Sequence, residues 1–317
     1  MALTGTNPTS SDARPADAAG SGASAPSGAA AAQSPTRKAP GWSLRWRVAS
    51  GLAFVPLLIL LARAGGLAWL GFVLLQVVLG LIEFYRMMRG KGLAVHPVLG
   101  SLTAIGVVTL AYRPHLAPAD FLITAVVLLI LALGLRRAEE RGIVEGIAAT
   151  LFGVLYVGWL SAHLVRLREL PWIAGTRYED GASYVLLAFF LTWSCDTGAY
   201  AFGRLFGRNR PWTTISPRKS VEGAIGGLVA AIAAGFVARV WFAPYLGLWD
   251  APVLGLLVGI CGQVGDLVES LLKRDARAGD SSDFIPGHGG ILDRFDSLYF
   301  GAPLVFYYLK AVVFRVP

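Results

Sequence analysis

Apolar stretches of about bilayer length recur along this sequence and constrain its fold more than any other feature. A membrane-spanning helix needs about 20 mostly apolar residues, because the hydrocarbon core is about 30 Å thick. Inside lipid the backbone must satisfy its own hydrogen bonds, so such stretches form helices. We therefore predict an all-α fold, a polytopic membrane bundle of about nine transmembrane helices. The nine stretches are residues 48–62, 66–84, 93–112, 117–135, 143–165, 182–203, 221–242, 250–272 and 297–314.

The first two stretches share a tight turn at Gly65-Gly66. Because the first is short, this pair could also form a hairpin that does not cross the membrane completely.

The balance of apolar and charged residues supports a membrane protein and excludes a water-soluble enzyme. Hydrophobic residues make up 55% of the chain and charged residues only 15%, whereas an ordinary globular chain has about 25% charged residues. Two cysteines, Cys195 and Cys261, both lie in apolar stretches. They are too few for a disulfide framework or a cysteine-rich zinc motif.

The chain divides into three parts by composition. Residues 1–41 are rich in Ala, Ser, Gly and Pro and contain no aromatic residue, which predicts a disordered tail. Residues 42–180 form the N-terminal membrane helices. Residues 181–317 form the membrane helices that carry the charged motifs, and we expect these motifs on loops at the cytoplasmic face.

Basic residues orient the predicted bundle. Most of the 28 Lys and Arg residues fall on one side when alternate loops are assigned to opposite faces of the membrane. Positive loops stay inside the cell, so we expect a cytoplasmic N-terminus. This bias also explains the net charge of +8 without a nucleic-acid partner.

The sixth and the eighth apolar stretches contain acidic residues where a passive helix would not place them. Asp196 falls in the sixth stretch, and Asp266 and Glu269 fall late in the eighth. An acid within a span costs about 2.5–3.5 kcal/mol on insertion scales, so these acids need partners. Two alternatives stay open: ion pairs with Arg204 or Lys273, or bound cations.

A glycine-rich turn separates two helical segments that carry the remaining charged residues. Asp266, Glu269 and Lys273 are three or four residues apart and share one face of a helix, as do Asp293 and Asp296 on the next. The turn between them, residues 286–290, has free backbone N–H groups that suit an anion. Carboxylates suit a hard divalent cation, and basic side chains suit phosphate oxygens. The segment therefore predicts a phosphate-and-metal site.

A second basic segment, residues 203–223, leads into the seventh stretch. Lys219 and Ser220 lie where a helix N-terminus presents N–H groups to an anion. The alternative is that these basic residues only set topology and contact lipid headgroups. A small-residue face at residues 223–227 fits a homodimer, and it fits packing within one chain equally well.

The run from Ser270 to Asp296 resembles the signature of the phosphatidate cytidylyltransferase, or CDP-diacylglycerol synthase, family. Residues 196–207 and 216–223 also match landmarks of that family, and the likeness covers roughly residues 45–317. The matching signature residues are Ser270, Lys273-Arg274, Asp280, Pro286-Gly287-His288-Gly289-Gly290 and Asp293-Arg294-Phe295-Asp296.

The resemblance implies roles for these residues. Asp266 and Asp293 would hold a catalytic Mg2+, with a second, monovalent cation such as K+ beside it. Ser270, Lys273 and Arg274 would contact substrate phosphates or orient the ligands, and together with the two metal ligands they are the expected catalytic residues. The remaining expected substrate-binding residues are Lys219, Ser220, Asp196, Asp280, His288, Arg294 and Asp296.

The resemblance also implies an activity and a location. The enzyme would make CDP-diacylglycerol and pyrophosphate from CTP and phosphatidate, at the cytoplasmic face of the inner cell membrane. Gly279 stands where the family has Lys, so a paralogue that uses another lipid phosphate is an alternative. A membrane transporter or a non-catalytic scaffold is the second alternative.

Overall fold

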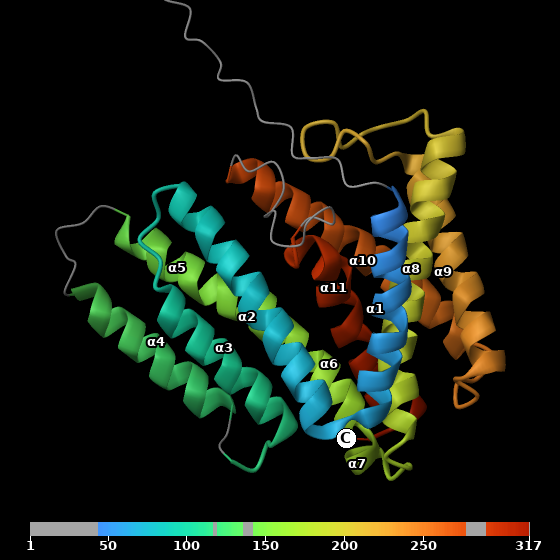
Figure 1. Ribbon diagram of the computed structural model, residues 1–317, viewed down its shortest axis with the longest axis horizontal. Coiled ribbons are helices and arrows are strands. Elements are labelled where there is room, and N and C mark those ends of the chain that lie inside the picture. The colour runs from blue at the N-terminus through green and yellow to red at the C-terminus, as the bar shows by residue number, and fades with distance from the viewer. Residues whose placement is uncertain (1–43, 117–118, 136–141, 277–289, 317) are drawn as a thin grey trace, which may run out of the picture. The chain divides into compact units, whose positions relative to one another are not determined.

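The computed structural model describes residues 44–116, 119–135, 142–276 and 290–316, and within these ranges the chain forms only helices and connecting loops (Figure 1). The all-α fold class predicted from the sequence is thus confirmed for this part of the chain. The predicted tail, residues 1–41, lies outside the described residues.

The first half of the described chain contains the shorter helices. Its π-helical segment η1 joins α5 and α6 into one continuous helix. In chain order the elements are α1 (Leu44–Ala64), α2 (Gly66–Gly90), α3 (Pro97–Tyr112), α4 (Ala119–Leu135), α5 (Ile143–Gly153), η1 (Val154–Trp159), α6 (Leu160–Glu169) and α7 (Pro171–Ala174).

The second half contains three long helices and a final helix that continues into a π-helical end. These elements are α8 (Asp180–Phe206), α9 (Val221–Trp241), α10 (Asp250–Asp275), α11 (Leu292–Tyr308) and η2 (Leu309–Val313). Their bounds lie within a few residues of the last four predicted stretches, except that α11 begins five residues earlier than expected.

Five helices in the described ranges are long and apolar enough to cross a membrane, fewer than the nine expected. They are α2, α5–η1–α6, α8, α9 and α10. Three other apolar helical stretches are shorter: Ala53–Ala64, Pro97–Tyr112 and Phe121–Leu135. Helix α3, with 16 residues, extends only about 24 Å. That is less than the hydrocarbon thickness of about 30 Å. The chain is a multi-pass membrane protein.

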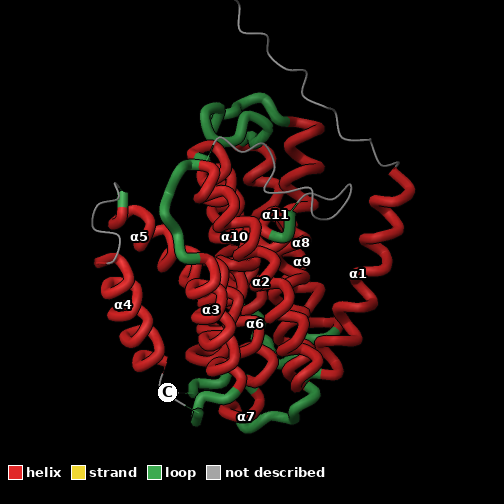
Figure 2. The backbone as a smooth tube through the Cα atoms, turned by 60° about the vertical axis from the view of Figure 1, so that its left-hand side comes forward, coloured by secondary structure: helices red, strands yellow, loops and turns green. Residues whose placement is uncertain are grey.

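Helix α11 lies among several other helices and connects the two halves of the bundle. It packs against α10, α6 and α8 and also contacts α2, as the central position of its red ribbon in Figure 1 illustrates. Figure 2 shows α4 at the edge of the bundle, and α4 contacts mainly α3 and α5. The residues at the start of α11 are therefore held from several sides.

Glycines let α8 and α9 approach closely. A Cβ atom on Gly198 would come within 2.4 Å of Ala230 Cβ, and one on Gly226 within 2.3 Å of Phe202 Cβ. Gly223, Gly226 and Gly227 are buried. The small-residue face at residues 223–227 thus packs against α8 in the same chain, which is one of the two interpretations left open by the sequence.

The expected turn at Gly65-Gly66 separates α1 from α2. Gly65 has φ +61°, and Gly66 has φ +52°. The fully buried Arg168 closes this turn: its Nε donates to Ala62 O at 2.6 Å, and one terminal nitrogen donates to Arg63 O at 3.3 Å. A Cβ atom on Gly65 would lie 2.3 Å from that side chain, so only glycine fits here.

Candidate active site

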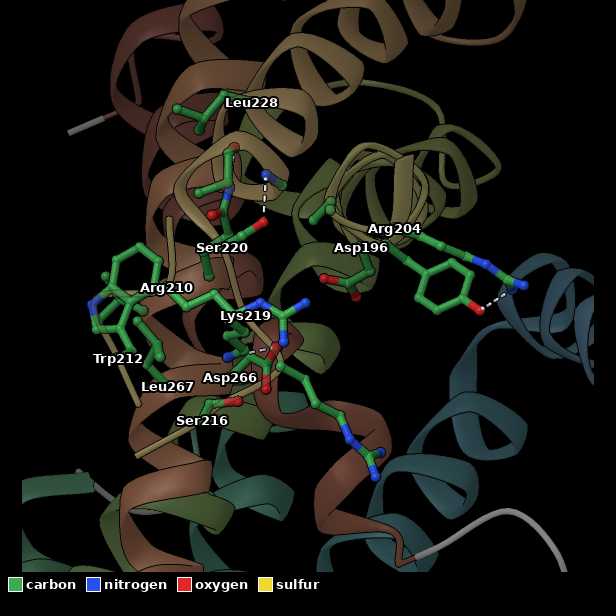
Figure 3. A pocket seen from close by; sticks show the side chains of 18 of the residues that line it. Asp196, Arg204, Arg210, Trp212, Ser216, Lys219, Ser220, Leu228, Asp266 and Leu267 are labelled. Carbon is green, nitrogen blue, oxygen red and sulfur yellow. Dashed lines mark hydrogen bonds and ion pairs between the residues drawn. The ribbon is translucent and has the colours of Figure 1, made fainter. Parts of the chain in front are cut away.

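A cavity of about 680 Å³ lies between α8, α9, α10 and the loop of residues 207–220 (Figure 3). Four cationic side chains line it together with two carboxylates, Asp196 and Asp266. Helices α9 and α10 also contribute large apolar side chains to the wall. The cations are Arg204, Arg210, Arg218 and Lys219, and the large apolar residues are Leu228, Ile260, Val264 and Leu267.

The loop that forms one wall of the cavity is held in place by hydrogen bonds to α9 and α10. Glu222 accepts hydrogen bonds from the backbone N–H groups of Arg208 and Asn209 and, at 2.7 Å, from Asn209 Nδ2. Arg274 on α10 donates to Ile215 O at 3.3 Å. Arg210 donates to Pro217 O at 3.2 Å within the loop. The loop therefore presents its basic side chains from a defined backbone.

Lys219 and Ser220 lie at the N-terminus of α9, as the sequence predicted. Ser220 is the N-cap residue, and its Oγ accepts a hydrogen bond from Gly223 N at 3.1 Å. Lys219 Nζ lies 2.8 Å from Asp266 Oδ2, so the loop is also tied to α10 by an ion pair (Figure 3).

Three carboxylates from three helices lie close enough to repel one another: Asp196 on α8, Asp266 on α10 and Asp296 on α11. Asp296 is buried and accepts a hydrogen bond from Ser297 N at 2.6 Å. Ser297 Oγ lies 3.5 Å from Asp196 Oδ1. Because like charges repel, this group is suited to a bound cation, and Lys219 partly neutralises it.

A second charged cluster lies one to two turns further along α10. Lys273 Nζ lies 2.7 Å from Glu269 Oε2 and 2.9 Å from Asp293 Oδ1 on α11. Glu269 is almost fully buried. Asp293 also accepts a hydrogen bond from Gly290 N at 3.2 Å. Lys273 thus joins the ends of α10 and α11.

The structure brings most of the expected site residues to these two clusters. Asp196, Lys219, Ser220, Asp266 and Asp296 belong to the first, and Lys273 and Asp293 to the second. Three expected residues lie on the same helix segments: Ser270 is half-buried on α10, and Arg274 and Arg294 are exposed. Two expected residues, Asp280 and His288, lie outside the described residues.

Two polar residues on α2 that sequence reasoning did not include contact α11. The buried Glu83 accepts hydrogen bonds from two N–H groups at the start of α11, and Gln76 donates to Tyr299 OH at 2.8 Å. Glu83 follows directly from an apolar run within the second predicted stretch. Its position inside a predicted membrane span could therefore have identified Glu83 as a candidate, as the same feature did for Asp196.

The described part of the chain offers few protein ligands for the expected Mg2+. No group of three or more His, Cys, Asp or Glu side chains arranged for a metal occurs among the residues that the structure describes. Mg2+ in phosphate-transfer sites is bound by one or two carboxylates, with water and substrate phosphate completing the shell. Asp266 and Asp293 supply hard oxygen donors of this kind, although each now pairs with a lysine. The donor chemistry of each carboxylate suits such an ion.

Comparisons with known proteins show to which family the chain belongs. The cytidylyltransferase family matches residues 45–312. A phosphatidate cytidylyltransferase of Synechocystis sp. is 35% identical over 287 residues, which covers 83% of this chain and 95% of the relative. The Staphylococcus epidermidis enzyme of that name is 32% identical, over 80% of this chain and 93% of its own.

A third relative, the phosphatidate cytidylyltransferase of Staphylococcus saprophyticus, is 40% identical over 158 residues, half of this chain and 57% of the relative. The resemblance inferred from the signature at residues 270–296 is therefore confirmed, and the chain belongs to the cytidylyltransferase family.

Proposed function

We propose that this protein is a phosphatidate cytidylyltransferase, which makes CDP-diacylglycerol and pyrophosphate from CTP and phosphatidate. The observation that carries this proposal is the cavity between α8, α9 and α10. It combines four cationic side chains, two carboxylates and an apolar wall in one space. A nucleoside triphosphate and a lipid phosphate both need such cations, and the lipid also needs the apolar wall. The relatives that match this chain carry the same enzyme name.

The charges of the cavity explain how two anionic substrates can meet. CTP and a lipid phosphate repel each other, and positive side chains at close range cancel that repulsion. Arg204, Arg210, Arg218 and Lys219 surround the space from α8 and the loop. The N-terminus of α9 adds its partial positive charge next to Lys219. These groups bind the phosphates and hold them in line.

In the proposed reaction, a phosphate oxygen of the lipid attacks the α-phosphorus of CTP. The new O–Pα bond forms as the bond between Pα and the β-phosphate oxygen breaks, and pyrophosphate leaves with that electron pair. The attacking phosphate is already largely ionised at neutral pH, so this step needs no strong general base. We assign to Lys273 and Arg274, at the end of α10, the role of stabilising negative charge on the leaving phosphates.

Asp266 and Asp293 are the proposed ligands for Mg2+, which when bound would neutralise charge on the phosphates of CTP. The Asp196 and Asp296 carboxylates increase the negative potential next to Asp266 and favour a second cation such as K+ in the same region. When no metal is bound, Lys219 and Lys273 neutralise the two ligand carboxylates.

The proposed site faces the cytoplasm, where CTP is available, in the inner cell membrane. The basic loop at residues 207–220 supports this orientation, because basic loops stay on the cytoplasmic side. The apolar wall supports access from the lipid: Ile260 and Val264 on α10 are both more than 40% exposed. The water-soluble and the lipid substrate can then reach the cavity from different sides.

The test is an activity assay with purified protein in detergent, CTP labelled at the α-phosphate, phosphatidate and Mg2+. We expect lipid-soluble label from the native protein, and at least a ~100-fold loss in the Asp266→Asn and Asp293→Asn variants. Asp250→Asn is the matched control, since Asp250 is on the same helix 16 residues away, about 24 Å along its axis. It should retain activity.

Two outcomes would replace this proposal. Label that forms only with another lipid phosphate would identify a paralogue, consistent with Gly279 at a position where the family has Lys. The absence of label with every lipid phosphate would favour a transporter or a scaffold. Equal activity in the native protein and both Asn variants would contradict the roles of Asp266 and Asp293.

A further inference from the structure

Glu83 is a buried carboxylate that lies outside the cavity but contacts the helix that carries Asp293. It is on α2, it is only 1% exposed, and it is more than 200 residues from its partners in sequence. Its Oε1 accepts a hydrogen bond from Ile291 N, and its Oε2 accepts one from Leu292 N, each at 3.0 Å. Both carboxylate oxygens therefore bind the start of α11.

The position of these bonds has a physical reason. The first N–H groups of a helix have no partner within the helix, and they form the positive end of its dipole. At α11, Asp293 accepts the Gly290 N–H, while Glu83 accepts the next two. A carboxylate with two acceptor oxygens is the side chain best suited to bind two neighbouring N–H groups.

These bonds fix the residue that comes directly after them. Asp293 follows Leu292 in the chain, and its side chain pairs with Lys273, which also pairs with Glu269. A small rotation or shift at the start of α11 would move the Asp293 carboxylate relative to α10. We propose that Glu83 is a positioning residue for the nucleotidyl transfer: it holds the start of α11 so that the Asp293 carboxylate keeps its position beside Lys273 on α10. This inference rests on the proposed function.

A second contact between α2 and α11 offers a control for simple packing. Gln76 lies two turns before Glu83 on α2, is also buried, and donates to Tyr299 OH at 2.8 Å. This bond links the same two helices but does not involve the first turn of α11. If Glu83 only packed the helices together, the loss of either bond would have similar effects.

The test compares Glu83→Gln with Gln76→Met. Glutamine keeps the size of Glu83 but has a single acceptor oxygen, and its amide group would face one of the two backbone N–H groups. We expect Glu83→Gln to remain folded and to lose about 10–100-fold in kcat, with a raised Mg2+ concentration for half-maximal activity. Gln76→Met should lose thermal stability while its kcat stays within about threefold of the native value. Glu83→Asp, which keeps the charge, should lose less kcat than Glu83→Gln.

Hydrogen exchange provides a readout that does not depend on activity. In Glu83→Gln the amides of Ile291 and Leu292 should exchange at least ~10-fold faster than in the native protein, because an N–H group that has lost its acceptor is less protected. Unchanged exchange there, or equal kcat losses in Glu83→Gln and Gln76→Met, would overturn the positioning role. An inactive native protein would contradict the proposed function, and the exchange result would still decide whether Glu83 anchors α11.

Discussion

Lys273→Met is the substitution whose consequences follow most directly from the structure. Lys273 Nζ lies 2.7 Å from Glu269 Oε2 and 2.9 Å from Asp293 Oδ1. The side chains are 18% exposed for Lys273, 3% for Glu269 and 19% for Asp293. Methionine has a similar length but no charge, so the change would leave two carboxylates without their shared cation, and one of them is buried.

The size of the effect follows from burial. Removing one partner of a buried ion pair costs about 3–5 kcal/mol, because the other charge is left uncompensated. A loss of that size is a large part of a typical folding free energy of about 5–15 kcal/mol. At roughly 2 °C or more per kcal/mol, the unfolding temperature should fall by at least ~6 °C. The transferase activity should be lost as well, since the same ammonium group is proposed to stabilise charge on the leaving phosphates.

A double variant separates the two effects. The double variant Lys273→Met/Glu269→Gln also lacks the buried carboxylate charge of residue 269. Most of the lost free energy of unfolding should therefore return. Its activity should stay low, because Asp293 and the phosphates still lack their cation. Lys91→Met is the matched control: Lys91 pairs with Asp275, but that pair is exposed, so its loss should cost only ~0–1 kcal/mol.

The measurements are thermal unfolding in detergent, followed by tryptophan fluorescence, and the labelled-CTP assay on the folded fraction. If Lys273→Met were as stable as Lys91→Met, Lys273 would not stabilise the contact between α10 and α11 by its ion pairs. If the double variant recovered full activity, Lys273 would have no part in catalysis.

Two further predictions concern the turn at Gly65 and the loop of residues 207–220. Gly65→Ala should cost at least ~1–3 kcal/mol in the same unfolding assay, because φ is +61° and the new Cβ would meet Arg168. Gly90→Ala, where no atom of the described residues lies within 4 Å of the new Cβ, should be almost neutral. Equal stability losses in the two variants would contradict the role of Gly65 in the turn. Glu222→Ala should loosen the loop of residues 207–220 and raise the KM for CTP several-fold. An unchanged KM with a lowered kcat would show instead that the loop does not bind CTP.

Much of the fold could be predicted from hydrophobic length alone, because a long apolar run has few alternatives to a helix. The ends of α9 and α10 lie within three residues of the predicted stretches for this reason. The number of membrane spans was harder to predict. Helices α3 and α4 are apolar, but they are shorter than the bilayer core, and a pattern of residue types does not show where a helix of 16 or 17 residues lies relative to lipid.

The candidate site was predictable where charged residues follow helical spacing. Glu269 and Lys273 are four residues apart and do form an ion pair, and Ser220 does cap α9. Contacts between distant segments could not be read from spacing. The pairing of Lys219 with Asp266 and of Glu83 with the start of α11 depends on how α2, α9, α10 and α11 pack, which only the folded chain defines.

The most direct test of the central claim is a structure determined with Mn2+ and a non-hydrolysable CTP analogue, with the metal located by anomalous scattering. The account predicts a peak about 2.0–2.2 Å from carboxylate oxygens of Asp266 and Asp293, with Lys219 and Lys273 moved onto the phosphates of the nucleotide. A map without a peak, in which both aspartates remain paired with these two lysines while the nucleotide is bound elsewhere, would contradict it.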